Sequence, residues 1–186
     1  MMRESTQTYL LSRWGKPTRT AEFEGQGLSI EILKWDAEAT GEGVDIYVTL
    51  GSGGGPLEDA TTAKHRSEFL LGLHPGQDDV VSSFAALGLY ERKNGAILKN
   101  GDTVPSDGPL WPGTEMMAFL ILEQEAIIPK LQLPDGSHVH FLQAIPLHES
   151  ELVFKRSHGA EALMGWWESN MVPFWDSGRG PAVPNF

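Results

Sequence analysis

Two runs of alternating apolar and polar residues set the strongest limit on the fold of this chain. In residues 28–35 the side chains of Leu28, Ile30 and Ile32 recur at every second position, and residues 44–50 alternate in the same way. A period of two is typical of a β-strand with one buried face. A loop that contains Gly41-Glu-Gly43 joins the runs, so the sequence predicts an antiparallel pair of strands.

The order of the remaining elements predicts an α+β fold. Further strands are expected at residues 68–73, at the continuous apolar run 116–122, and at 138–145, where Pro146 is expected to end the strand. Helices are expected at three places: from Asp78, which can cap the first one, to Tyr90 or Glu91; from Glu149 to Arg156; and over 160–168. Since these elements do not alternate as regular βαβ units, we expect a mixed, mostly antiparallel sheet layered with a few helices.

Length and composition bound the organisation of the chain. A chain of 186 residues with 40% hydrophobic residues suits one globular domain, which we place at residues 1–180. Residues 177–186 are rich in Gly and Pro and are expected to form a flexible tail. The chain contains no cysteine, which excludes thiol catalysis and Cys-based zinc sites.

The net charge of −11 disfavours some classes of binding partner and favours others. An acidic surface repels phosphate backbones and anionic lipids, so we expect neither a nucleic acid nor a membrane as partner. The same charge speeds the encounter with a basic protein. No signal-peptide core occurs near the first residues and the longest apolar run, 116–122, is too short to span a bilayer, so a cytoplasmic location is expected.

Two motifs raise the question of a cofactor or metal. The glycine-rich stretch 51–56 lacks the Gly-Lys-Ser/Thr of a phosphate loop, and Pro56 removes a backbone donor, so we expect no bound cofactor. His138 and His140 lie two positions apart on an expected strand, where both side chains point to one face. Together with His148 or Glu149 as a third ligand, these two histidines could bind a metal ion. The alternative hypothesis is therefore a metal-dependent enzyme.

Large aromatic residues gather near the carboxyl end. Trp166 and Trp167 lie on the last expected helix, whose buried side we assign to Leu163, Met164 and both tryptophans. Phe174 and Trp175 follow shortly afterwards. Rings of this size either anchor a helix to the core or form the centre of a binding surface, and the sequence leaves both interpretations open.

A series of short motifs resembles the amino-terminal domain of Suppressor of fused proteins over roughly residues 28–180. A Gly-Asp pair follows the first long helix, an apolar strand ends in an acidic residue, and a Phe-Leu-Gln strand precedes two helices. The residues that carry these motifs are Gly101-Asp102, Met117 to Glu123, Phe141-Leu-Gln143, Glu149-Ser-Glu-Leu152 and Gly159-Ala-Glu-Ala-Leu163. Residues 48–52 and 66–70 fit the family's opening strands, and Asp176 and Arg179 its closing segment.

The resemblance implies a layered domain that binds another protein and catalyses no reaction. The eukaryotic members hold transcription factors, whereas bacterial single-domain relatives include immunity proteins that neutralise toxins. This short chain is similar to the bacterial form, so the expected partner is another protein, with a basic toxin domain as the candidate. A structural domain that pairs with the sheet edge of a host protein is a further alternative.

The resemblance also implies two partner-binding residues, Tyr90 and Asp102. In two-domain members, a Tyr near the end of the long helix and the Asp of the Gly-Asp pair line the groove for the partner peptide, and these positions match. A phenol offers an aromatic face with a polar tip, and a carboxylate accepts hydrogen bonds. The alternatives are a packing residue at the helix end for Tyr90 and a turn after Gly101 for Asp102.

Overall fold

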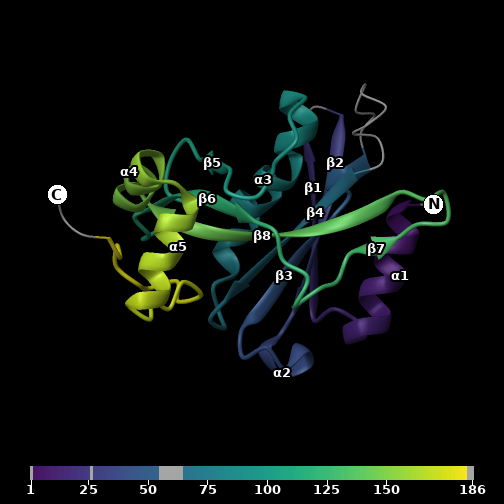
Figure 1. Ribbon diagram of the computed structural model, residues 1–186. Helices are drawn as coiled ribbons and strands as arrows, with labels where there is room; N and C mark the ends of the chain where they lie inside the picture. Colours follow the sequence, from purple (N-terminus) through teal and green to yellow (C-terminus); the bar gives the residue numbers. More distant parts are fainter. Residues whose placement is uncertain (1, 26, 55–64, 184–186) are drawn as a thin grey trace.

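The computed structural model describes residues 2–25, 27–54 and 65–183, which fold around one large sheet (Figure 1). The helices are α1 (Met2–Trp14), α2 (Ala37–Thr40), α3 (Val81–Asn94), α4 (Glu149–His158) and α5 (Ala160–Ser169), with 3₁₀ turns at Ser52–Gly54 and Asp78–Val80. The strands are β1 (Arg19–Gly25), β2 (Leu28–Trp35), β3 (Asp45–Leu50), β4 (His65–Leu73), β5 (Thr103–Pro105), β6 (Met116–Leu122), β7 (Leu131–Gln132) and β8 (His138–His148).

The sheet has eight strands in the order β1-β2-β3-β4-β8-β6-β5, and β7 pairs with β8 beside this path. All pairs are antiparallel except β4 with β8. The predicted antiparallel pair is β2 with β3, where Glu31 faces Leu50 and Trp35 faces Ile46. The predicted mixed, mostly antiparallel α+β architecture is therefore confirmed.

Helices cover the two faces of the sheet unequally. The alternation along β8 sends Leu142 and Ala144 into the core under α3, while Phe141 and Ile145 point to the opposite face. On that opposite face, α1 covers one end of the sheet, and α4 with α5 covers the other, as Figure 1 shows at the right and left of β8. In the middle of this face, around Gln143, none of the described helices covers the sheet.

Helix α3 lies close to the sheet because Gly88 has no side chain. A Cβ at this position would meet Ile30 Cδ1 and would lie 2.9 Å from both Ser52 Oγ and Thr49 Cγ2. Contacts of this length force neighbouring atoms to move. The glycine therefore sets the distance between the long helix and strands β2 and β3.

The predicted strand end at Pro146 is wrong, because β8 continues to His148. Pro146 pairs with Phe119 of β6, whereas the pairing of β8 with β4 already ends at Gln143. The carbonyl of Pro146 accepts a hydrogen bond from Arg179, so it points away from β6. A strand residue directs its N–H and C=O to the same side, and the N–H that proline lacks is therefore not needed by the ladder.

Within the described part of the chain, no helix has both the length and the apolar character needed to cross a membrane.

Candidate functional site

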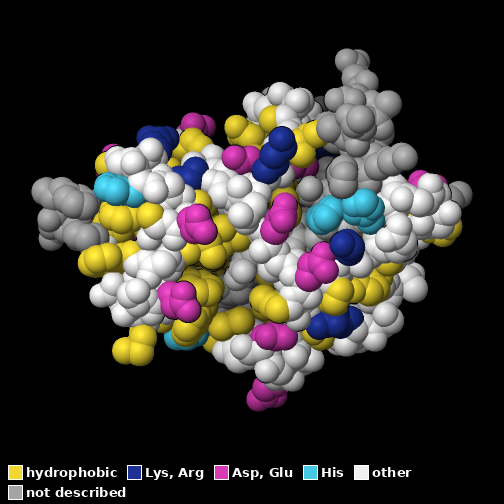
Figure 2. Space-filling model, in the orientation of Figure 1, with side chains coloured by type: hydrophobic (Ala, Val, Ile, Leu, Met, Phe, Trp, Pro, Cys, Tyr) yellow, Lys and Arg dark blue, Asp and Glu magenta, His cyan; other side chains and the backbone are white. Residues whose placement is uncertain are grey.

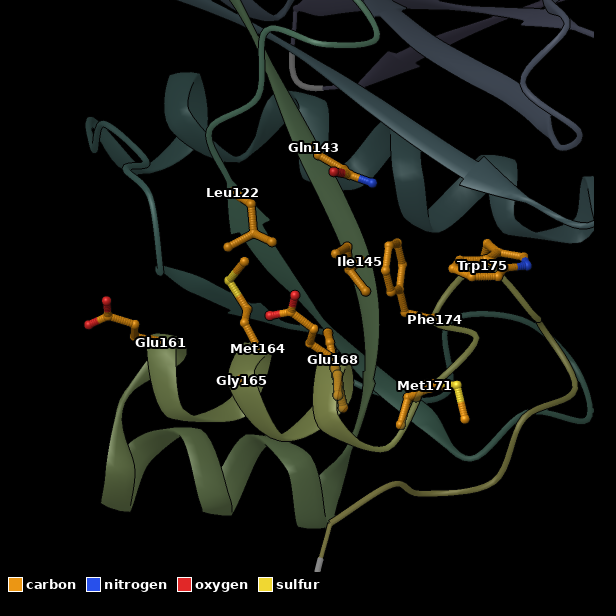
Figure 3. Close-up of a pocket in the computed structure, with 12 residues that line it drawn as sticks. Leu122, Gln143, Ile145, Glu161, Met164, Gly165, Glu168, Met171, Phe174 and Trp175 are labelled. Carbon is orange, nitrogen blue, oxygen red and sulfur yellow. The ribbon is translucent and has the colours of Figure 1, made fainter.

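An apolar hollow lies beside α5 on the sheet face. Its volume is about 650 Å³. The floor consists of Leu122 on β6 with Gln143 and Ile145 on β8, and the wall is α5 with the segment that follows it (Figure 3). We call this hollow the α5 groove; its lining residues are Leu122, Gln143, Ile145, Glu161, Met164, Gly165, Trp167, Glu168, Met171, Val172, Phe174 and Trp175.

Large apolar side chains reach solvent around the α5 groove. Met171 is 87% exposed, Met164 41% and Trp175 38%, and the neighbouring Trp166 is 37% exposed. The prediction that Met164 and Trp166 are buried is therefore wrong. Helix α5 buries Leu163 and Trp167, four positions apart, and the two neighbouring side chains fall outside that narrow face. Scattered exposed hydrophobics are ordinary, but a contiguous group at a hollow marks a binding surface.

Met171 occupies a backbone position that normally favours glycine. Helix α5 ends in a Schellman motif, since the N–H of Val172 donates to the carbonyl of Trp167 and the N–H of Met171 to that of Glu168. The residue in the left-handed conformation is Met171, with φ 49°, and it is the only non-glycine residue with positive φ in the described ranges 2–25, 27–54 and 65–183. A side chain there costs about 1–2 kcal/mol. Fold stability does not explain this methionine, because its side chain is almost fully exposed.

The edge of the α5 groove is acidic. Glu161 and Glu168 line the groove, and no Lys or Arg is among its lining residues. Figure 3 shows the Glu168 side chain beside Met164 and Ile145, and Glu161 at the far end of the helix. In Figure 2 a hollow near α5 and the middle of β8 is bordered by hydrophobic side chains in yellow, with acidic side chains in magenta around it. This surface suits an apolar ligand that carries positive charge.

A buried ion pair holds α4 and the carboxyl-terminal segment together behind the groove. Both guanidinium nitrogens of Arg179 bind the fully buried carboxylate of Glu151, at 2.5 Å for Nη1 and 3.0 Å for Nη2. The backbone N–H groups of His148 and Ala182 donate to the same carboxylate. The guanidinium also lies over the Trp167 ring, 5.2 Å from its centroid. This network fixes Trp167, a residue of the groove wall.

The structure of the carboxyl-terminal segment differs in part from the flexible tail that the sequence predicts for residues 177–186. The described residues 177–183 contain neither helix nor strand, and residues 184–186 lie outside the described part. Arg179, however, is buried and hydrogen-bonded to Glu151 and Pro146. A Gly- and Pro-rich composition excludes regular structure but does not exclude a single anchored side chain.

Neither of the two residues implied by the family resemblance lines the α5 groove. Tyr90 is half-buried in α3 and packs against the core beneath that helix. Asp102 follows α3 in a turn, where its carboxylate accepts the N–H of Lys99 at 2.7 Å and its own N–H donates to the Lys99 carbonyl. No direct bond joins the two side chains among the interactions of the described residues. The role of Tyr90 and Asp102 in binding remains a proposal.

Glu91, next to Tyr90, is buried with one hydrogen-bond partner. Burial raises the pKa of Glu91 to about 7, although the N–H of Leu98 donates to its carboxylate at 2.7 Å. Between the ordinary value of 4.5 and 7, the folded chain binds more protons than the unfolded chain at this group. The free energy of unfolding therefore falls as the pH rises through this window.

We expect Glu91→Gln to stabilise the protein at pH 8 by about 1–3 kcal/mol and to change its stability little at pH 5. Glutamine keeps the acceptor for Leu98 and removes the charge that is costly to bury. Urea denaturation at both pH values measures the effect. In the variant, the free energy of unfolding should still fall with rising pH, but less steeply than in the wild type. Part of the dependence stays because burial also raises the pKa of Glu68 to about 7. A variant less stable than the wild type at pH 8 contradicts this explanation.

A buried carboxyl group of the protein already binds the backbone donors of the glycine-rich loop. The carboxylate of Glu68 accepts the N–H groups of Gly51 and Ser52, at 2.8 and 3.2 Å, and the hydroxyl of Thr49 at 2.6 Å. Backbone donors that a phosphate loop offers to a ligand are thus used within the protein. Residues 55 and 56 of the motif lie outside the described part.

His138 and His140 lie side by side on β8, with ring centroids 4.8 Å apart. The expected third ligand, His148, is at the other end of the strand, and its Nε2 lies 3.0 Å from the carbonyl oxygen of Arg179. Among the described residues, no group of three His, Asp or Glu side chains is placed to hold a metal ion. The structure therefore brings the two histidines together, and the part of the chain that it describes adds no third ligand to them.

Comparison with known proteins identifies similar chains. A family model described as Suppressor of fused protein matches residues 26–180. A structure described as a Suppressor of fused homologue of Neisseria gonorrhoeae FA 1090 has a TM-score of 0.73 at 17% identity, covering 99% of this chain and 98% of the other. No curated protein matches the chain.

Two further structures share the fold. The chain in a Sufu–Fu complex has a TM-score of 0.72 at 13% identity, covering 97% of this chain and 90% of the other. Drosophila Suppressor of Fused has a TM-score of 0.63 at 12% identity, covering 83% of this chain, which spans 42% of the Drosophila protein. At these identities the structures establish the fold alone.

Proposed function

Because the chain belongs to the Suppressor of fused family, we propose that it is an immunity-type protein that binds and neutralises a toxin partner. The fold of this family supports a protein-interaction module without catalysis, and one structure with the same fold is a complex with another protein, Fu. The finer role, neutralisation of a toxin in the cytoplasm of a bacterium, is our proposal.

The α5 groove carries this proposal. Solvent-exposed Met164, Met171 and Trp175 line a hollow of about 650 Å³, and methionine and tryptophan are enriched in the buried centres of protein interfaces. The net charge of −11 favours rapid association with a basic protein, such as a nuclease toxin. Tyr90 and Asp102 are proposed as a second contact with the same partner, outside the groove.

The alternative, a metal-dependent enzyme, rests on His138 and His140. These side chains interact with each other, and the described residues supply no third ligand nearby. Metal analysis of the purified protein separates the hypotheses, since one bound ion per chain supports the enzyme.

Co-expression tests the proposed function. Toxin domains encoded beside this chain in its source genome are expressed with and without it, and growth and the purified complex are measured. We expect the chain to restore growth and to form a 1:1 complex. Failure to restore growth, together with no complex, refutes the immunity role.

Conservative variants test the second contact. Tyr90→Phe removes only the phenol oxygen, and Asp102→Asn keeps the acceptor for Lys99 and removes the charge. If these residues bind the toxin, the double variant weakens the complex about tenfold or more. Unchanged affinity excludes Tyr90 and Asp102 from the interface and leaves the binding function in place.

A further inference from the structure

The α5 groove offers side chains and no free strand edge at its floor. Gln143 of β8 pairs with Leu70 of β4 on one side and with Leu122 of β6 on the other. A ligand at this point therefore cannot add a strand to the sheet. It must fill the hollow with apolar side chains of its own.

The two acidic residues at the groove lie on α5 at a spacing that a second helix can match. Glu161 and Glu168 lie on α5 at positions seven apart, which corresponds to two helical turns and about 10.5 Å along the axis. A helix laid along α5 with basic residues at the same spacing can place one cation near each carboxylate. Apolar residues on the adjacent stripe of that helix then face Met164 and Ile145.

The charge of the chain argues against a second copy in the groove. A symmetric contact through this surface places Glu161 and Glu168 near the same residues of the other copy, and each copy has a net charge of −11. Like charges placed together in an interface are costly. The described end of the chain does not fill the groove either, since the N–H of Ala182 donates to Glu151 and neither Ala182 nor Val183 is among the lining residues.

Met171 gives independent support for a ligand in the groove. It lines the hollow, is almost fully exposed, and has a left-handed conformation that disfavours its side chain. Strained residues that persist without stabilising the fold are frequent at binding sites. Methionine side chains also adapt to irregular apolar surfaces.

From these observations we propose that the α5 groove binds an amphipathic helix of the partner protein, with an apolar stripe and two Lys or Arg residues seven positions apart. This inference rests on the proposed function, because it names the part of the partner that the module recognises. The apolar stripe fills the hollow over Ile145, Met164 and Met171, and the basic residues pair with Glu161 and Glu168.

A library of 18-residue amphipathic helices displayed on phage tests the proposal with purified, full-length protein. The apolar stripe is kept, and the flanking positions are varied among Lys, Glu and Gln. We expect selection to enrich pairs of Lys seven positions apart. Selection of helices with Glu at these positions, or no enrichment over scrambled sequences, overturns the inference.

Variants of the chain locate the binding surface on an enriched, fluorescein-labelled peptide. Met171→Gly removes the apolar side chain and suits the left-handed conformation, and Glu161→Gln with Glu168→Gln removes both charges. We expect each change to weaken binding about tenfold, measured by fluorescence anisotropy. Matched controls, Val153→Ser on exposed α4 and Glu22→Gln on β1, should change affinity by less than about twofold. Equal affinity of all variants overturns the assignment.

The tryptophan indole signals provide a readout within the same molecule. In the NMR spectrum, the indole N–H signal of Trp175, at the groove, should shift when the peptide is added. The signal of Trp35 should not shift, because this side chain is buried and its N–H donates to the carbonyl of Gly15. A shift produced by the fluorescent apolar dye ANS but not by the peptide identifies a small-molecule pocket and overturns the proposal.

The same variants separate this inference from the proposed function. If the chain neutralises the toxin and the Met171 and Glu variants do so equally well, the function stands and the helix-binding groove is refuted. If the peptide binds and no toxin is neutralised, the groove stands and the immunity role fails. Dimerisation through the groove, detected by sedimentation, also refutes the proposal.

Discussion

Arg179→Ala should lower the free energy of unfolding by about 3–5 kcal/mol at pH 7, because it leaves the buried carboxylate of Glu151 without its cation. Arg179 binds both oxygens of that carboxylate and also donates to the carbonyl of Pro146 at 2.9 Å. Water does not replace these bonds easily, since Glu151 is fully buried. For a chain of this length the loss corresponds to a decrease in Tm of roughly 6–20 °C.

Thermal and urea denaturation measure this effect, with Arg3→Ala as the matched control. Arg3 forms a partly exposed ion pair with Glu31 at 3.0 Å, and its loss should cost less than about 1 kcal/mol. Arg179→Met combined with Glu151→Gln should cost less than Arg179→Ala alone, because no unpaired charge stays buried. Similar losses for Arg179→Ala and Arg3→Ala contradict the structural role of the buried pair.

The sequence predicted those elements whose side chains repeat regularly. The alternation in β2 and β3, the apolar run of β6 and the charges of α4 all identified the observed elements. Helix α1 and strand β1 were not predicted, for a physical reason. Helix α1 buries only Thr6 and Leu10 among its described residues, and β1 alternates exposed and half-buried residues with Ala21 and Phe23 as its apolar side chains, so both elements give only a weak apolar signal.

Contacts between residues far apart in the chain could not be predicted from the sequence. The sequence left open whether the aromatic residues near the carboxyl end form a core or a binding surface, and the structure buries Trp167 and exposes Trp166. Nothing in the sequence showed that Leu122, Gln143 and Ile145 form the floor under these residues. Their proximity depends on the pairing of β6 with β8, which is a property of the tertiary fold.

Asp78 illustrates the same limit. The sequence suggested a helix cap, but its side chain makes no capping bond and the first turn is a 3₁₀ turn. The carboxylate instead accepts hydrogen bonds from Lys34 at 2.7 Å, Tyr47 at 2.8 Å and Arg19 at 2.8 Å. A local signal for a cap cannot distinguish these distant partners, since all three lie more than 30 positions earlier in the chain.

Lys34 is the cation at the centre of that second buried network. Its Nζ lies 2.8 Å from the buried carboxylate of Asp45 and 2.7 Å from the partly exposed carboxylate of Asp78. Burial lowers the pKa of Lys34, but the hydrogen bonds to both carboxylates outweigh it and raise the pKa above its ordinary 10.5. The hydrogen bond from Lys34 is the main cause that lowers the pKa of Asp78 below 3.8, against the opposing effect of burial. Lys34 therefore stays charged, and it joins β2, β3 and the start of the long helix.

Lys34→Met should lower the free energy of unfolding by about 3–5 kcal/mol at pH 7, since Asp45 is then a buried charge without its cation. The lowered pKa of Asp78 contributes stability above pH 3.8 that is lost as the pH falls, and the variant lacks part of this contribution. The difference between wild type and variant should therefore shrink below pH 3.8. Urea denaturation at pH 7 and pH 3.5 measures both effects.

Two comparisons make this last prediction specific. Lys93→Met, at an exposed position of α3, should change stability by less than about 0.5 kcal/mol. Lys34→Met combined with Asp45→Asn should cost less than the sum of the two single changes, because no unpaired charge then stays buried, even though the single amide oxygen can accept only one of the N–H groups of Ala37 and Gly76. Additive costs would show that Lys34 and Asp45 act independently, and a difference that grows at low pH would exclude Asp78 as the partner of Lys34.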